Sequence, residues 1–454
     1  MKIIALFTAV GLVAACDLDV GDLNNPSIDD LEKNPTVASV TAASTGLLIG
    51  NRRNVAAANG YISELGILGR ESYNFDTADP RFIGELLQGK LNPGSPFGGN
   101  FWTGPYANIK LANTIQRVVD NVAEFSAEER SSIKGFSKTI EALDLLEVLN
   151  AHDTNGGVID TDRPLDGALG AVVGKPQLIA EIARLLDEAA ADLAAGGEKF
   201  PFALSNGYEG FDTPVVPAPP SMVPTSFLQF NRAVRARVAV YAKDYPAAIT
   251  ALGMSFVDEM PMTQADLDLG VFHSFSTGSG DAVNNLINPN IYAHPSVRAD
   301  AMAGDLRLAR KVGVAKKAGS GQGLTSVDAF SVYVGPAARV PIIRNEELLL
   351  LLAEARFFTN DVPGAYMALN AVRTTSGGLA ALTAQPDMAM FVDQLLYERR
   401  YSLLFEGHRW IDLRRFMKPL PLDMPDHEQN VRYPLPLSEC NARPGDPACM
   451  LGST

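Results

Sequence analysis

Histidine is the side chain best suited to acid–base or metal chemistry near neutral pH, and the five in this chain are scattered: His152, His273, His294, His408 and His427. No two of them have the HExxH spacing that places two imidazoles on one helix face around zinc. The three cysteines form no zinc cluster, and no glycine-rich loop ending in Lys-Ser or Lys-Thr is present to hold a phosphate. The sequence therefore predicts no metal site and no cofactor.

Two places put a histidine beside a carboxylate. His152 and Asp153 stand where a predicted helix ends, which favours a turn and cap over a catalytic dyad. Glu406 and His408 lie in a run whose many charges nearly balance, as is typical of an ion-pair network. Carboxylates that could form a glycosidase pair are abundant, but sequence does not place two of them about 5–9 Å apart. We therefore predict that the protein is not an enzyme, with a surface glycoside hydrolase as the alternative.

The cysteine at position 16 follows a segment typical of export signals. Lys2 supplies a positive charge, residues 3–13 are mostly apolar and too few to span a bilayer, and Ala14-Ala15 are small. Small residues leading into a cysteine resemble the lipobox of bacterial lipoproteins, in which Cys16 would carry acyl chains. Several chains anchor a protein stably where one does not. We expect residues 1–15 to be a lipoprotein signal peptide; the alternative is a plain signal peptide with an incidental cysteine.

Lipidation of Cys16 would leave an even pair, Cys440 and Cys449. The segment between them contains Asn441, Pro444, Gly445 and Pro447, which favour turns that bring the two ends together. Exported proteins fold in an oxidising compartment. We expect these two cysteines to form a disulfide within the proline-rich tail, residues 417–454.

Composition limits the partners. The 454 residues are 46% apolar and 20% charged, which is enough to bury a large core. The formal net charge is −14, which argues against nucleic acid and anionic lipid head groups as partners.

The sequence pattern predicts which helices and loops position the candidate residues. Residues 16–35 read as an acidic tether, followed by an alanine-rich helix from about 36 to 59. Apolar side chains at three- and four-residue spacing predict further helices from Trp102, over 128–150, 175–195, 226–253, 343–372 and 388–416. The segments 69–100 and 254–340 lack this period and read as loops, the second with short β-like pieces.

Residues 236–252 and residues 353–369 form a weak internal repeat. Each copy contains an Asp that can cap a helix and a Pro two residues later, in the first turn, where no N–H is needed: Asp244 with Pro246, and Asp361 with Pro363. Two helix–turn–helix units of this kind resemble tetratricopeptide hairpins. Their separation is far from the 34 residues of a regular array.

Residues 398–415 read ERRYSLLFEGHRWIDLRR. This string resembles the C-terminal signature of the SusD/RagB family, roughly ERRxELxFEGxRWxDLxR, with Ser402 where the family usually has an acid. Weaker matches occur in family order: the lipobox, Trp102 to Asn113, Arg344 to Ala355, and Leu369 to Arg373. Physically, the apolar residues of the string can fill a core, its charged residues can make buried pairs, and Gly407 permits a break between two helical pieces.

The resemblance implies a mostly α fold: an irregular set of tetratricopeptide-like hairpins with loop-rich insertions and minor β structure, in one domain over residues 36–416. It also implies a lipoprotein of the outer membrane, facing the cell exterior. Such a protein would capture a nutrient and hand it to a SusC-like TonB-dependent transporter. A glycan or oligosaccharide is favoured, and a peptide is the alternative. A scaffold that binds only proteins is a further alternative.

The ligand site is expected in the two loop-like regions, because sugar rings stack on aromatic side chains and their hydroxyls need polar partners. Trp102 is excluded, since its helix face suggests core. The candidates are Tyr73, Asn74, Asp76, Arg81 and Phe97 in the first region, and Phe272, Phe275 and Tyr292 in the second, beside Asn290.

Overall fold

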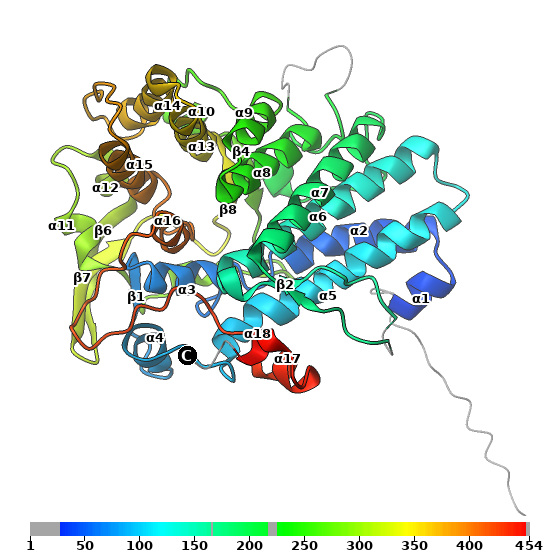
Figure 1. Ribbon diagram of the computed structural model, residues 1–454, viewed down its shortest axis with the longest axis horizontal. Coiled ribbons are helices and arrows are strands. Elements are labelled where there is room, and N and C mark those ends of the chain that lie inside the picture. Colours follow the sequence, from blue (N-terminus) through cyan, green and yellow to red (C-terminus); the bar gives the residue numbers. More distant parts are fainter. Residues whose placement is uncertain (1–27, 165–166, 217–224, 451–454) are drawn as a thin grey trace, which may run out of the picture.

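The computed structural model describes residues 28–164, 167–216 and 225–450. Helices dominate, which confirms the predicted mostly α fold (Figure 1). The longer helices are α2 (Val37–Asn51), α5 (Pro96–Val118), α6 (Ala127–His152), α7 (Lys175–Ala194), α8 (Phe227–Ala242), α9 (Tyr245–Gly253), α13 (Asn345–Phe358), α14 (Val362–Thr375) and α15 (Met388–Ser402). The shorter ones are α1 (Ile28–Lys33), α3 (Tyr61–Leu68), α4 (Arg81–Ile83), α10 (Gln264–Asp268), α11 (Pro295–Ala299), α12 (Leu306–Lys311), α16 (Arg409–Arg415), α17 (Leu437–Ala442) and α18 (Pro447–Met450).

The strands form small antiparallel pairs rather than one sheet. They are β1 (Ser72–Asn74) with β5 (Ile291–Ala293), β2 (Gly157–Val158) with β3 (Val172–Val173), β4 (Gly270–His273) with β8 (Val340–Arg344), and β6 (Val312–Gly321) with β7 (Leu324–Phe330). Figure 1 shows β6 and β7 at the opposite end of the molecule from α1, α2 and α5–α7. The segment 69–100 is more regular than predicted, because it contains β1, α4, a π-helical turn and the start of α5.

Local capping and apolar spacing explain the long helices. At the start of α6 the Ser126 hydroxyl accepts from the backbone N–H of Glu129, and the Glu129 carboxylate accepts from the backbone N–H of Ser126, which completes a capping box. In α7 the apolar face predicted from the spacing is buried: Leu178, Ile182, Leu185, Leu186, Ala189 and Leu193. The first predicted helix is shorter than expected, since α2 ends at Asn51.

The internal repeat corresponds to two helix hairpins, α8–α9 and α13–α14, as predicted. Asp244 accepts from the backbone N–H of Ala247 at 3.2 Å, and Asp361 accepts from that of Gly364 at 3.0 Å. The two aspartates have nearly the same backbone angles. The hairpins pack together through α9 and α13, where Tyr245 and Phe358 stack with ring centroids 4.8 Å apart.

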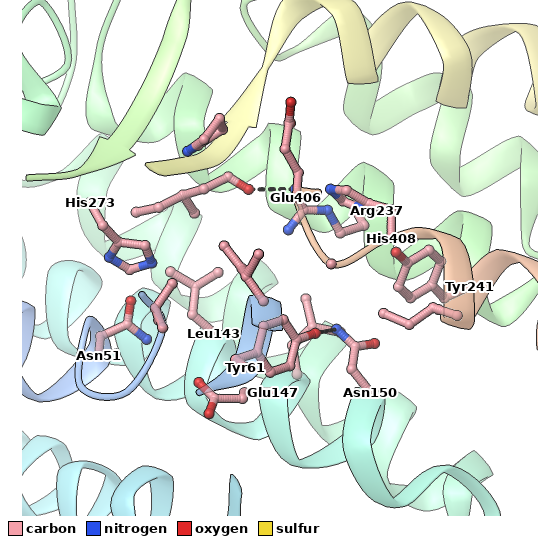
Figure 2. A pocket seen from close by; sticks show the side chains of 17 residues that line it. Asn51, Tyr61, Leu143, Glu147, Asn150, Arg237, Tyr241, His273, Glu406 and His408 are labelled. Atoms are coloured by element: carbon pink, nitrogen blue, oxygen red, sulfur yellow. Dashed lines mark hydrogen bonds between the residues drawn. The ribbon is translucent and has the colours of Figure 1, made fainter. Parts of the chain in front are cut away.

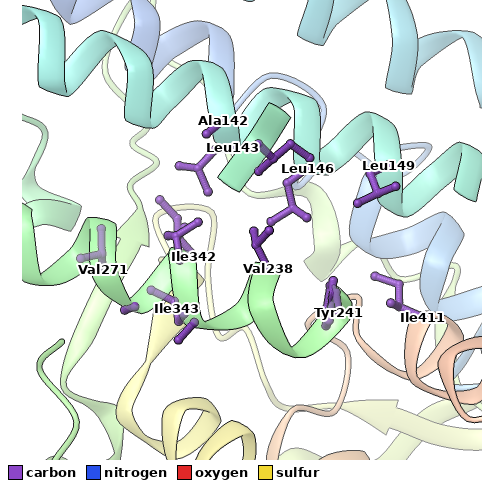
Figure 3. Packing of buried hydrophobic residues seen from close by; sticks show 14 of the residues in the cluster. Ala142, Leu143, Leu146, Leu149, Val238, Tyr241, Val271, Ile342, Ile343 and Ile411 are labelled. Carbon is purple, nitrogen blue, oxygen red and sulfur yellow. The ribbon is translucent and has the colours of Figure 1, made fainter. Parts of the chain in front are cut away.

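The core reaches the centre of the molecule, where helices meet the β4–β8 pair. Figure 3 shows Leu143 and Leu146 of α6 close to Val238 of α8 and to Ile342 of β8. These side chains are buried. The β4–β8 pair therefore lies where the helical hairpins α8–α9 and α13–α14 meet the loop-rich part of the chain.

The C-terminal string supplies the ion pairs that the sequence predicts, and most of these groups are buried. Glu398 accepts from both Arg307 and Arg373 at 2.6 Å. Ser402, where the family usually has an acid, accepts from Arg307 at 3.0 Å. Other pairs include Arg399 with Asp412, Arg415 with Glu354 and Asp412, and Arg344 with Glu406. Gly407 has φ +84° and separates α15 from α16, as predicted.

The tail carries two short helices, α17 and α18, and the structure joins Cys440 to Cys449 with Cα atoms 5.4 Å apart. Cys16, the signal peptide and most of the predicted tether lie outside the described residues. Among the residues that are described, no helix is both long and apolar enough to span a bilayer.

Candidate ligand-binding site

The two loop-like regions chosen from the sequence meet in space. Strand β1 of the first pairs with β5 of the second, and Tyr73 lies opposite Tyr292 in that register. The pairing continues through the backbone N–H of Phe75, which donates to the carbonyl of Asn290 at 2.9 Å. Phe75 and Tyr292 then contact each other with ring centroids 5.5 Å apart.

These two rings lie at a groove of about 700 Å³, within the usual size range of ligand pockets. The groove runs between the β1–β5 pair and the β6–β7 hairpin. Its aromatic lining is Phe75, Tyr292, Phe330 and Tyr333, and its polar lining is Thr77, Asn288, Asn290, Lys316, Lys317 and Ser320. It therefore combines ring faces with amide, hydroxyl and ammonium groups on one surface.

A buried cluster of polar side chains fixes the β1–β5 pair on the side of the protein interior. The Tyr73 hydroxyl donates to Asp423 at 2.6 Å, and His294 Nε2 lies 2.6 Å from the same carboxylate. Arg70 Nε is 3.2 Å from it. Burial opposes ionisation of Asp423, but the contacts from His294, Tyr73 and Arg70 outweigh burial and lower its pKa well below the usual range. Tyr73 is therefore part of the support of the groove and is itself buried.

A second pocket, of about 510 Å³, adjoins the groove along the chain, since Asn285 lines the pocket and Leu286 lines the groove. Phe275 lines this second pocket, and the Arg52 guanidinium lies 5.8 Å from the centre of its ring. Arg52 also pairs with Asp281. Phe275, Tyr292 and Asn290 are thus predicted residues that line these neighbouring pockets.

The other predicted residues line neither the groove nor this second pocket. Phe97 is fully buried in α5 and packs on Phe82 at 5.2 Å, so the structure places it in the core and not at a ligand surface. Asn74 and Asp76 accept hydrogen bonds from nearby backbone N–H groups, and Arg81 makes two bonds to Asp79 at 2.8 Å. Phe272 lies half-buried in β4, away from the lining of the groove.

Sequence reasoning missed Lys316, Lys317 and Asn288 as lining residues. The lysines belong to a glycine-flanked strand, and nothing in their local pattern separates them from ordinary solvent-exposed residues. Phe75 and Asn290 stand in the two regions that were chosen. Their position at the groove follows from the β1–β5 pairing, which joins segments more than two hundred residues apart.

A smaller polar pocket of about 90 Å³ lies at the centre of the molecule. Figure 2 shows Tyr61, Glu147, Arg237, His273 and His408 around it. The Asn150 amide donates to the Tyr61 hydroxyl at 3.0 Å, and Arg237 donates to Glu347 at 2.6 and 2.7 Å. This volume is well below the roughly 300–1,000 Å³ that is usual for ligand pockets.

Three titratable groups of this central pocket have pKa values shifted toward their neutral forms. Burial, followed by the charge of Asp144, raises the pKa of Glu147 well above its usual range. Burial and the Arg52 charge lower the pKa of His273 to about 3, and burial likewise lowers the pKa of His408.

The two histidine–carboxylate pairs considered for catalysis belong to the buried structural framework of the protein. Glu406 accepts from Arg344 at 2.9 Å, whereas His408 faces Glu347 at 3.8 Å, so they have different partners. His152 ends α6, as predicted, and burial lowers its pKa to about 4. Within the described ranges, no group of three or more His, Cys, Asp or Glu side chains is arranged to hold a metal ion.

Comparisons with known proteins identify the relatives of this chain. Residues 328–436 match the model of the SusD family, and no curated protein matches the chain. Solved structures of similar fold include a SusD superfamily protein from Bacteroides vulgatus (16% identity, 91% of this chain and 99% of that one covered, TM-score 0.68). Others are a SusD-like carbohydrate binding protein from Bacteroides fragilis (16%, 89% and 98%, 0.64) and a laminarin binding SusD-like protein (14%, 89% and 97%, 0.61).

Proposed function

We propose that this chain belongs to the SusD/RagB family, whose model matches residues 328–436, and that it captures an oligosaccharide in the groove beside β1 and β5. It then hands the sugar to a SusC-like TonB-dependent transporter of the outer membrane. The observation that carries the proposal is the groove itself, where Phe75 and Tyr292 stand beside Asn288 and Asn290.

This combination suits a carbohydrate. The C–H faces of a sugar ring stack on aromatic rings, and its hydroxyls exchange hydrogen bonds with amides and hydroxyls. Asn288, Asn290 and Ser320 supply such groups along the groove. Relatives described as carbohydrate binding and laminarin binding support the same ligand class.

A glycan panel tests the function. The purified protein is run through native gels that contain dissolved polysaccharides, including laminarin, amylose and polygalacturonate, with the heat-denatured protein as control. We expect at least one glycan to retard the folded protein without release of reducing ends. Rapid release of reducing ends would favour a hydrolase, and retention by peptides alone would favour a peptide-capturing protein of the same kind.

We also propose that acyl chains on Cys16 hold the protein at the outer membrane, facing outward. We expect the Cys16→Ala protein to move from the membrane fraction to the soluble fraction while keeping the wild-type melting temperature, because several acyl chains supply the anchoring. Fractionation in high salt followed by immunoblotting measures this. A variant that still sediments with membranes would contradict the anchor, and protease treatment of whole cells tests which face it occupies.

A further inference from the structure

The β6–β7 hairpin contains a large irregularity where it faces the groove. Val314 pairs with Asp328, and the next regular pair is Gly319 with Ser326. Residues 315–318 of β6 therefore stand opposite Val327 alone. Extra residues in one strand form a bulge that changes the direction of its side chains, and such bulges are frequent beside binding sites.

The bulge is fixed against the aromatic pair. The Tyr292 hydroxyl donates to the backbone carbonyl of Lys317 at 3.2 Å. Gly319, which follows the bulge, is packed so closely that a Cβ atom there would lie 2.5 Å from the Tyr292 ring and 2.6 Å from the Phe75 ring. The absence of a side chain at Gly319 thus allows the bulge to close on the two rings.

The bulge brings two positive charges to the groove. Lys316 and Lys317 are exposed and line it, and neither forms an ion pair with any residue that the structure describes. No carboxylate is among the described residues that line the groove. Asp328, on the facing strand, is paired with Arg298 at 2.6 Å.

The neighbouring pocket has the same sign of charge. Arg52 and Arg53 line it, and its one described acid, Asp281, is held by Arg52 and by the hydroxyl of Ser276. The whole chain has a formal charge of −14, so two neighbouring pockets lined by lysines and arginines differ from what composition alone would give. A cleft lined by charge of one sign attracts ligands of the opposite sign, and distant acids are screened beyond about 8 Å at physiological salt.

We infer that the oligosaccharide is anionic, with carboxylate or sulfate groups that pair with Lys316 and Lys317 while one of its rings stacks on Tyr292. This inference rests on the proposed function. Glycan carboxylates and sulfates share the chemistry that ammonium groups recognise.

Pairs of polysaccharides that share a sugar backbone but differ in charge show which of the two features the protein recognises. Polygalacturonate is compared with its methyl ester, and dextran sulfate with dextran, by native affinity electrophoresis and calorimetry of the full protein. We expect one or both anionic members to bind more tightly than the neutral partner, with affinity falling as salt rises. Preference for polygalacturonate assigns a carboxylate, and preference for dextran sulfate assigns a sulfate.

The variant Lys316→Glu/Lys317→Glu should weaken binding of the anionic polymer by on the order of tenfold or more, because attraction becomes repulsion. The control Lys199→Glu/Lys243→Glu makes the same change in net charge on exposed lysines of the helical part and should bind like wild type. Equal loss in both variants would overturn the site. Equal binding of neutral and anionic members would overturn the anionic ligand but leave glycan capture standing. Binding of none of the four overturns the inference, and the wider panel then decides the function.

Discussion

Replacing Glu398 by alanine is expected to lower the free energy of unfolding by about 3–5 kcal/mol, because it leaves two buried arginines without their shared carboxylate. Glu398, Arg307 and Arg373 are all buried, and both arginines donate to it at 2.6 Å. Denaturation in urea, read as a shift in midpoint at constant slope, measures the change.

An exposed ion pair provides the control for Glu398. Lys134 pairs with Asp120, whose side chain is 58% exposed, so Asp120→Ala should change stability by less than about 1 kcal/mol. Glu398→Ala that is as stable as wild type would show that the network of the C-terminal string does not hold α12, α14 and α15 together.

Phe97→Ala should cost about 3–5 kcal/mol of stability, as truncation of a fully buried aromatic does. Phe97 is completely buried and packs on Phe82, so the loss comes from lost contacts and a cavity in the core. Thermal and urea unfolding measure it. A Phe97→Ala protein with unchanged stability and a loss of glycan affinity would instead indicate that Phe97 contacts the ligand, as the sequence predicted.

Phe97 is buried whereas Tyr292 lines the groove, and this difference shows which features could be predicted from the sequence. Apolar spacing predicted the helices and the two hairpins, because apolar side chains that recur every three or four residues share one helix face. The C-terminal string predicted buried ion pairs for a similar reason: many balanced charges within an apolar run need partners. Both signals are local.

Orientation in the loop-rich regions is not local. The position of Tyr292 at the groove depends on the pairing of β1 with β5, short strands far apart in sequence, and the burial of Phe97 depends on the packing of α5 against Phe82. The bulge that presents Lys316 and Lys317 depends on the register of β6 and β7. Short strands without a strong period carry little register information, so the regions and some lining residues such as Tyr292 could be predicted, but Lys316 and Lys317 could not.

Calorimetric titration of Tyr292→Ala tests glycan capture in the groove most directly, with the glycan selected by the panel as ligand. Loss of one stacking contact should weaken binding by about 1 kcal/mol, or about fivefold. Tyr292→Phe, which keeps the ring and loses only the bond to Lys317, should bind nearly like wild type. Tyr245→Ala, a partly buried tyrosine stacked on Phe358 in the helical hairpins, should leave affinity unchanged. Wild-type affinity in Tyr292→Ala with an unaltered melting temperature would contradict the groove as the place where this protein holds its ligand.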